Sequence, residues 1–209
     1  PHMDELLKYF PSLTDNQRRQ FMLMDEVYRD WNAKINVISR KDIDNLYPHH
    51  VLHSLALAQI LRFKPGTRVM DLGTGGGFPG IPLAVMFPDA QFHLVDSIGK
   101  KIRVCNEVVA ALGLTNVTTA HSRVEEEKGR FHFVVSRAVM PLPDLVKLVR
   151  KNIDREQFNA LPNGILCLKG GDLQAETAPF RNKCEVTPLT TIFPDNDYFT
   201  TKSAVYVAI

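Results

Sequence analysis

The clearest candidate for a ligand-binding segment is the glycine-rich stretch 73–80, which directly follows the mostly apolar run 69–72. Glycine lets the backbone turn sharply and approach a ligand closely, because it has no Cβ atom. The stretch leads into a predicted helix with Pro79 in its first turn, where proline sacrifices no hydrogen bond. Ligands of open α/β sheets bind beyond the carboxyl ends of the strands, so these residues predict a nucleotide site there. A P-loop is excluded, because no Gly-Lys-Ser/Thr follows the glycines.

Two spacings of these glycines point to different ligands. Gly75-x-Gly77-x-x-Gly80 matches the dinucleotide fingerprint, and Gly73-x-Gly75-x-Gly77 matches the form found in methyltransferases. Asp71 stands two residues before the first glycine, and we expect its carboxylate at the mouth of the site. There it would repel the pyrophosphate of a dinucleotide and attract the ammonium and sulfonium groups of S-adenosylmethionine. Charge therefore favours S-adenosylmethionine, with Asp71, Gly73, Gly75 and Gly77 as binding residues.

Two later segments are expected to complete this site. Asp96 ends a predicted strand 23 residues after Gly73. An acid about 20 residues beyond the first glycines binds ribose hydroxyls in dinucleotide sites, and the same geometry serves adenosine. The loop 121–127 follows the next predicted strand and should flank the adenine, with backbone groups of Val124 and Glu125 at the ring edge.

Eight stretches of the chain, in this order and spacing, form a single pattern: Trp31-Asn32, Ile35–Val37, His50–Ser54, Asp71–Pro82, Val95–Lys101, Ser122–Glu126, Ser136–Ala138 and Leu168–Gly170. The runs Gly-Phe-Pro-Gly-Ile-Pro and Asp-Ser-x-Gly-Lys-Lys within them are far more specific than a bare glycine motif. Together they resemble the bacterial methyltransferases that modify a guanine of small-subunit (16S) ribosomal RNA at N(7), the family also called glucose-inhibited division protein B.

The resemblance implies a Rossmann-like α/β fold with a seven-stranded, mostly parallel methyltransferase sheet and an N-terminal helical cap. It implies cofactor contacts at Gly73, Phe78, Val124, Glu125 and Arg137. Residues that face the RNA or the methyl-transfer cleft, our candidate catalytic residues, are Arg123, Arg137 and Lys169. The family usually has Asp at position 53, where this chain has His53, so a carboxylate role there is in doubt.

Methylation of guanine at N(7), which the resemblance implies, requires no general base. The N(7) atom of guanine has a free lone pair and no proton at neutral pH, so catalysis can rest on positioning and desolvation. Arg and Lys suit guanine, whose Hoogsteen edge offers two acceptors, once the base is splayed out of the folded RNA. The sequence has no Asn/Asp-Pro-Pro-aromatic motif, and no cysteine follows a proline, as the nucleophile of many pyrimidine C(5) enzymes does. Lys169 could belong to a Lys-Asp-Lys-Glu set, so methylation of a ribose 2′-hydroxyl stays an alternative.

Other functions remain open on motifs alone. An NAD-dependent oxidoreductase could use the same glycine loop, although Asp71 argues against it. A non-catalytic RNA-binding module and a small-molecule methyltransferase are further alternatives. The expected partner is 16S ribosomal RNA or the small ribosomal subunit, and we expect a monomer. The net charge of +2 does not itself indicate nucleic acid, so an RNA-binding face requires gathered charge. The candidates form three groups: Arg18, Arg19, Arg29, Lys34, Arg40 and Lys41 in the cap; Lys100, Lys101 and Arg103 beside the predicted cofactor site; and Lys147, Arg150 and Lys151 at helical spacing.

Cysteine and histidine usage argues against structural cross-links. Three widely spaced cysteines, an odd number, predict neither a disulfide framework nor a zinc site and suit a reducing cytosol, so we expect a cytoplasmic protein. The histidines at 49, 50 and 53 have no acidic or Cys partner at ligand spacing in the sequence, so we expect no metal.

Length and pattern suggest a single α/β domain with a helical extension. The chain has 209 residues, 44% of them apolar, and no apolar run approaches the ~20 residues that span a bilayer, so we expect no membrane association. We assign 1–64 to the extension, with Pro1-His2 as the scar of a cleaved tag, and 65–209 to the cofactor-binding domain. Thr14 and Gln17 form a capping box that should begin one helix of the extension.

Beyond that helix, periodicity predicts further elements. The expected helices are Pro48–Leu61, Pro79–Phe87, Lys100–Leu112, Leu142–Lys151 and Leu173–Phe180. The expected strands are Arg68–Leu72, Gln91–Asp96, Val117–His121, Phe131–Ser136, Gly164–Lys169, Cys184–Ile192 and Ala204–Ile209. The last two are close together without a helix between them, which suggests an antiparallel hairpin at the edge of the sheet.

Overall fold

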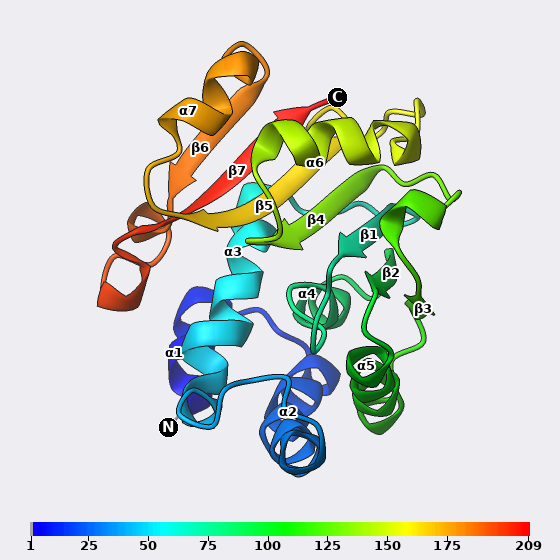
Figure 1. Ribbon diagram of the computed structural model, residues 1–209. Helices are drawn as coiled ribbons and strands as arrows, with labels where there is room; N and C mark the ends of the chain where they lie inside the picture. Colours follow the sequence, from blue (N-terminus) through cyan, green and yellow to red (C-terminus); the bar gives the residue numbers. More distant parts are fainter. Residues whose placement is uncertain (1) are drawn as a thin grey trace.

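The computed structural model describes residues 2–209, in which seven strands form one sheet with helices on both faces (Figure 1). Pro1, and with it part of the proposed tag scar, lies outside the described residues. The strands follow the order β3-β2-β1-β4-β5-β7-β6 across the sheet. Their bounds are β1 Arg68–Leu72, β2 Gln91–Asp96, β3 Val117–His121, β4 Phe133–Arg137, β5 Gly164–Gly170, β6 Cys184–Pro188 and β7 Lys202–Ala208.

The helices are mostly short. The α-helices are α1 His2–Tyr9, α2 Asp15–Lys34, α3 Leu52–Ile60, α4 Gly80–Met86, α5 Gly99–Leu112, α6 Leu142–Val149 and α7 Gln174–Thr177. A π-helical segment, η2 Leu46–Val51, leads into α3. The 3-10 turns are η1 Ile43–Asn45, η3 Val124–Glu126, η4 Arg150–Asn152, η5 Ala178–Phe180, η6 Leu189–Thr191 and η7 Asp197–Phe199.

The predicted sheet is confirmed in its main features. β1 to β5 are parallel, and β6 and β7 are antiparallel to each other, as the spacing of the last two strands suggests. The expected antiparallel pairing of the last two strands at the edge of the sheet is confirmed, and β7 lies between β5 and β6 and pairs antiparallel with both. Only β6 therefore occupies this edge of the sheet.

Among the elements that end earlier than predicted, two do so at a proline. The strand expected over Cys184–Ile192 ends at Pro188, because a proline has no N–H to continue the ladder. The helix expected over Leu173–Phe180 stops as an α-helix at Thr177 and continues as a 3-10 turn containing Pro179, which lacks the N–H that a further α-helical bond needs.

Successive side chains of each strand enter two different cores. On β1, Val69 packs with residues of α3, α4 and α5, whereas Met70 packs with residues of α6. On β4, Phe133 and Val135 share the first core and Val134 the second. Because helices cover both faces of the sheet, the sequences of these strands are mostly apolar and do not alternate between apolar and polar residues.

Helix α2 is tied to the domain that follows it. The predicted capping box of Thr14 and Gln17 is present at its start. The Gln17 side chain also donates to the Val85 carbonyl at the end of α4, at 3.1 Å. The buried Tyr28 hydroxyl donates to the Gly76 carbonyl at 2.8 Å. The cap therefore holds the glycine loop directly.

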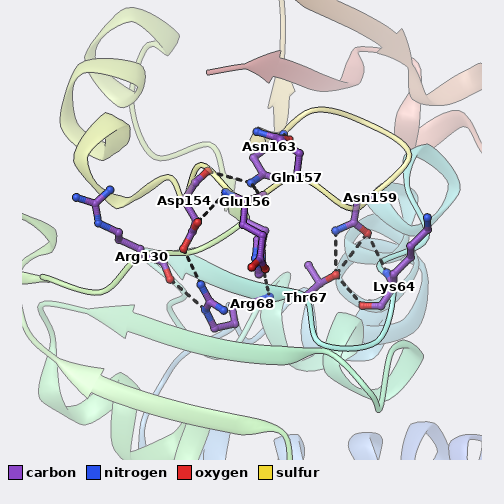
Figure 2. Close-up of polar contacts among 10 residues, drawn as sticks. Lys64, Thr67, Arg68, Arg130, Asp154, Glu156, Gln157, Asn159 and Asn163 are labelled. Carbon is purple, nitrogen blue, oxygen red and sulfur yellow. Dashed lines mark hydrogen bonds and ion pairs between the residues drawn. The ribbon is translucent and has the colours of Figure 1, made fainter.

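A polar network fastens the amino ends of the parallel strands (Figure 2). Arg68, which begins β1, pairs with Asp154 at 2.8 Å and donates to the Arg130 carbonyl at 3.3 Å. Asn163, just before β5, donates to the carbonyls of Asp154 and Glu156 at 2.9 and 2.6 Å. The segment before β5 is thus fixed against the start of β1.

Among residues 2–209, no helix combines the length and apolar character needed to cross a bilayer.

Gly164 is a position where a single methyl group should destabilise the fold. A Cβ atom there would lie 2.0 Å from the Val207 carbonyl oxygen of the neighbouring strand, a backbone atom that cannot rotate away. We expect Gly164→Ala to lower the free energy of unfolding by about 3 kcal/mol or more. Gly170→Ala, on the same strand, is the control, since its Cβ would meet Thr201 oxygen at an ordinary 3.7 Å. Equal urea midpoints for the two variants would contradict this prediction.

Candidate cofactor and methyl-transfer site

A cavity of about 340 Å³ lies beyond the carboxyl ends of β1 and β2. It is where the sequence predicts the ligand, and five of the predicted site residues line it: Gly73, Asp96, Arg123, Val124 and Glu125. The opposite wall was not predicted. It comes from the β4–α6 connection and from α6 itself, through Val139, Met140 and Leu148.

The glycine loop has the backbone that its sequence suggests. Gly73, Gly75 and Gly77 have φ of 65°, 59° and 113°, in the region that side-chain-bearing residues avoid. A Cβ atom at Gly75 would meet nothing within 4 Å, whereas one at Gly73 would lie 3.2 Å from the Val139 side chain. Space for a ligand therefore remains over Gly75.

Asp71 lies beneath the glycine loop and not at the mouth of the site, which corrects the expectation from charge. Its side chain is 1% exposed, and Oδ2 accepts hydrogen bonds from Thr74 Oγ1 at 2.7 Å and from Gly80 N at 2.8 Å. Burial raises the pKa of Asp71 to about 7 against the opposing effect of these bonds. Oδ1 has no hydrogen-bond partner among residues 2–209. Asp71 thus shapes the loop through one oxygen, while its other oxygen is buried without a partner in the described part of the chain.

Asp96 joins the loop to the cavity. Its Oδ2 accepts from Gly75 N at 2.8 Å and its Oδ1 from Ile98 N at 2.9 Å. A carboxylate oxygen can accept more than one hydrogen bond, so ribose hydroxyls entering the cavity would find acceptors already oriented.

The η3 turn presents backbone donors to the same cavity. Its bonds run from Glu127 N to the Val124 carbonyl and from Glu126 N to the residue before the turn. The first N–H groups of such a turn have no partner within it, which leaves those of Val124 and Glu125 for the edge of a base. The Glu125 carbonyl accepts instead from Lys151 Nζ at 2.6 Å.

Arg137, at the end of β4, belongs to a cluster that sequence reasoning missed. Its guanidinium carbon lies 5.4 Å from the centre of the buried Phe78 ring, and its Nη1 donates to His50 Nδ1 at 3.2 Å. The other ring nitrogen of His50 contacts Asp42 Oδ2 at 2.5 Å. Desolvation, followed by the charge of Arg137, lowers the pKa of His50 to about 4. His50 is therefore neutral at pH 7, donating to Asp42 and accepting from Arg137.

The surroundings of the histidines also differ from what their spacing in the sequence indicates. His49 Nδ1 contacts Asp42 Oδ1 at 2.7 Å, so an acid does lie beside two of these histidines in space, although not at ligand spacing in the sequence. His49 further stacks on Tyr198, with ring centres 3.6 Å apart. Within the described part of the chain, no group of three or more His, Cys, Asp or Glu side chains could hold a metal ion.

The three candidate catalytic residues are not in contact with one another. Arg123 is exposed on the cavity, and Arg137 lies beside Phe78. Lys169 is buried, donates to the Met140 carbonyl at 2.7 Å and pairs with Glu176 at 2.9 Å. Lys169 therefore supports the wall of the cavity in this structure and does not project into it.

The residues present fit S-adenosylmethionine. Open space over Gly75 admits a ligand, the unpaired Asp71 Oδ1 suits a cation, and Asp96 suits a ribose. The N–H groups of Val124 and Glu125, which line the cavity, would suit an adenine edge.

His53 should make the fold sensitive to acid. It is 6% exposed, and desolvation, then the charges of Arg137 and Lys202, lower its pKa to about 3. The unfolded chain, with a pKa near 6.5, binds this proton first, so stability is complete above pH 6.5 and falls as the pH drops towards 3. Between pH 7.5 and 5.5, we expect His53→Leu to lose about 1.4 kcal/mol less stability than the native chain. Urea unfolding at both pH values tests this, and equal losses would refute it.

Comparison with known proteins identifies the family. Residues 17–193 match the family described as rRNA small subunit methyltransferase G. A Bacteroides fragilis protein named ribosomal RNA small subunit methyltransferase G is 64% identical over 207 residues, 99% of this chain and 100% of its own length. A protein of the same name from Christiangramia forsetii is 52% identical over 205 residues, covering 98% of this chain and 96% of its own.

Solved structures agree on the fold. A mutant of MtNAS in complex with S-adenosylmethionine has a TM-score of 0.57 at 15% identity, over 92% of this chain and 76% of its own. The precorrin-6y C5,15-methyltransferase of Geobacter metallireducens has a TM-score of 0.56 at 10% identity, over 84% and 92%. The predicted Rossmann-like methyltransferase fold is thereby confirmed, and the sequence matches show that this chain belongs to the rRNA small subunit methyltransferase G family.

Proposed function

We propose that this protein transfers a methyl group from S-adenosylmethionine to N(7) of a guanine in 16S ribosomal RNA. The observation that carries the proposal is the cavity in which Gly73, Asp96, Val124 and Glu125 meet, in a chain of this family. When bound there, S-adenosylmethionine supplies an electrophilic methyl group. The N(7) lone pair can attack that group without a general base.

The protein contributes binding and orientation. Asp96 would hold the ribose, and the N–H groups of Val124 and Glu125 would hold the adenine. Arg123, exposed on the cavity, would donate to a guanine carbonyl while leaving N(7) free. Arg137, fixed by His50, would orient the amino-acid end of the cofactor. A site of this kind lowers the barrier mainly by positioning and by excluding water.

The alternatives lose support. Activation of a ribose 2′-hydroxyl would need a free lysine, and Lys169 is held by Met140 and Glu176. Membership in a methyltransferase family argues against an NAD-dependent oxidoreductase and a non-catalytic module.

The test is methylation of 16S ribosomal RNA, naked and in the small subunit, with a labelled methyl donor and mapping of the product. We expect label at N(7) of one guanine. We also expect S-adenosylhomocysteine, but not NAD, to raise the melting temperature. Label on a ribose hydroxyl, or none on RNA, would overturn the proposal.

We further infer a cytoplasmic monomer with ribosomal RNA as its macromolecular partner. The free state of all three cysteines, at positions 105, 167 and 184, agrees with a reducing compartment. We also propose the division at residue 65 as the start of the cofactor-binding domain. Sedimentation of the purified protein tests the oligomeric state.

A further inference from the structure

A second hollow, a groove of about 720 Å³, lies beside α6 and shares no lining residue with the cofactor cavity. Five cationic side chains line it: Arg130, Lys147, Arg150, Lys151 and Arg155. All five are exposed. They come from α6, from the η4 turn and from segments adjoining the amino ends of β4 and β5, so the fold gathers charge that is scattered in the sequence.

The positive charge of the groove is not neutralised locally. Over residues 2–209, none of these five cations forms a salt bridge. The acid in the lining, Asp154, is already paired with Arg68 at 2.8 Å. Figure 2 shows the Arg130 guanidinium directed away from that pair, while its backbone carbonyl accepts from Arg68. The groove thus lies beside a hydrogen-bonded polar network, and its exposed cations have no acidic partner in the described part of the chain.

The groove and the cofactor cavity share a wall. Leu148 of α6 lines the cavity, whereas its neighbours Lys147 and Arg150 line the groove. Lys151, in the groove, donates to the carbonyl of Glu125, which lines the cavity. A helix with its side chains is about 10 Å across, a distance that a few nucleotides span.

We propose that this groove binds the phosphate backbone of the substrate RNA a few nucleotides from the methylated guanine. The inference rests on the proposed function and adds a second contact surface to it. Exposed cations without acidic partners fit a polyanion, because phosphate contacts supply most of the affinity and the register of nucleic-acid binding. A protein partner would need an apolar centre, and only Ile153 and Ile209 contribute apolar side chains to this lining.

The test compares two triple variants with equal loss of charge. The groove variant carries Lys147→Gln, Arg150→Gln and Arg155→Gln. Lys151 is left unchanged because its side chain donates to the carbonyl of Glu125, which lines the cofactor cavity. The control carries Arg62→Gln, Arg181→Gln and Lys183→Gln, exposed cations that also lack salt bridges in the described chain. Fluorescence anisotropy measures binding of a labelled 16S ribosomal RNA transcript between 50 and 200 mM salt, and calorimetry measures binding of S-adenosylhomocysteine.

We expect the groove variant to bind the RNA about tenfold or more weakly, with a slope of log affinity against log salt smaller by roughly 2. The control should lose less than half of that effect, and both should bind S-adenosylhomocysteine normally. Equal losses in the two variants, or no loss in either, would overturn the proposal. A defect confined to assembled small subunits, with naked RNA bound normally, would assign the groove to a ribosomal protein and also overturn it. If the native protein binds the cofactor product but neither binds nor methylates RNA, the proposed function fails instead.

Discussion

Gly75→Val should bind S-adenosylmethionine at least about 100-fold more weakly than the native protein. A side chain at Gly75 projects into space that no protein atom occupies within 4 Å, and we assign that space to the cofactor. The backbone N–H of Gly75 also donates to Asp96, so a displaced backbone would disturb the ribose acceptor as well. A 100-fold loss corresponds to about 2.8 kcal/mol. Calorimetric titration with S-adenosylhomocysteine measures it.

Gly113→Val is the matched control for this variant. Gly113 has φ of 68°, close to the 59° of Gly75, and its Cβ would also meet nothing within 4 Å. Both variants therefore carry a similar backbone strain, but Gly113 ends α5 away from the cavity. Normal binding by a folded Gly75→Val protein would refute the placement of the cofactor. If valine prevents folding, the Gly75→Ala and Gly113→Ala pair asks the same question.

Arg137→Lys should lower kcat/KM for RNA methylation by about 100-fold. Lysine keeps the charge but loses the planar guanidinium that faces Phe78 and donates to His50. Burial lowers the pKa of Arg137, against the opposing charges of Tyr198 and Asp71. The assay is the initial rate with labelled methyl donor, at several concentrations of cofactor and of RNA. A rate within threefold of the native value would contradict a role in the site.

Two substitutions at His50 distinguish its hydrogen bonds from the space that its ring fills. His50→Leu removes the acceptor for Arg137, and we expect about a tenfold loss of activity with a raised KM for S-adenosylmethionine. His50→Gln keeps an amide oxygen towards Arg137 and an N–H towards Asp42, so it should recover much of that loss. Equal activities for the two variants would show that the ring acts only by filling space.

The part of the site that could be read from the sequence is the part built from neighbouring residues. The glycine loop follows β1 and Asp96 ends β2, two strands that were predicted to the residue, and carboxyl ends of parallel strands meet at one edge of the sheet. Asp71 was misplaced for a reason that the sequence could have revealed. Met70 and Leu72 share one core, so strict alternation puts Asp71 on the other face, under the first N–H of α4.

The Arg137 cluster could not be predicted in the same way. His50 and Arg137 are 87 residues apart, and Asp42 lies in an irregular polar stretch with no periodic signal. Only the packing of α3 and its preceding π-helical turn against the sheet brings them together. Likewise, Lys169 sits at a strand end as expected, but its neutralisation by Glu176 depends on where α7 folds back.

Because the Tyr28 hydroxyl donates to the Gly76 carbonyl, we expect the amino-terminal helices to influence cofactor affinity. Residues of α2 also share one continuous apolar core with α4 and α5. A fragment beginning at residue 65 would expose this apolar surface to water and would lack the hydrogen bond from Tyr28 to the glycine loop. We therefore expect it to aggregate or to bind the methyl donor poorly. The amino-terminal segment and the nucleotide fold should accordingly melt in a single cooperative transition, and ligand added to one should stabilise both.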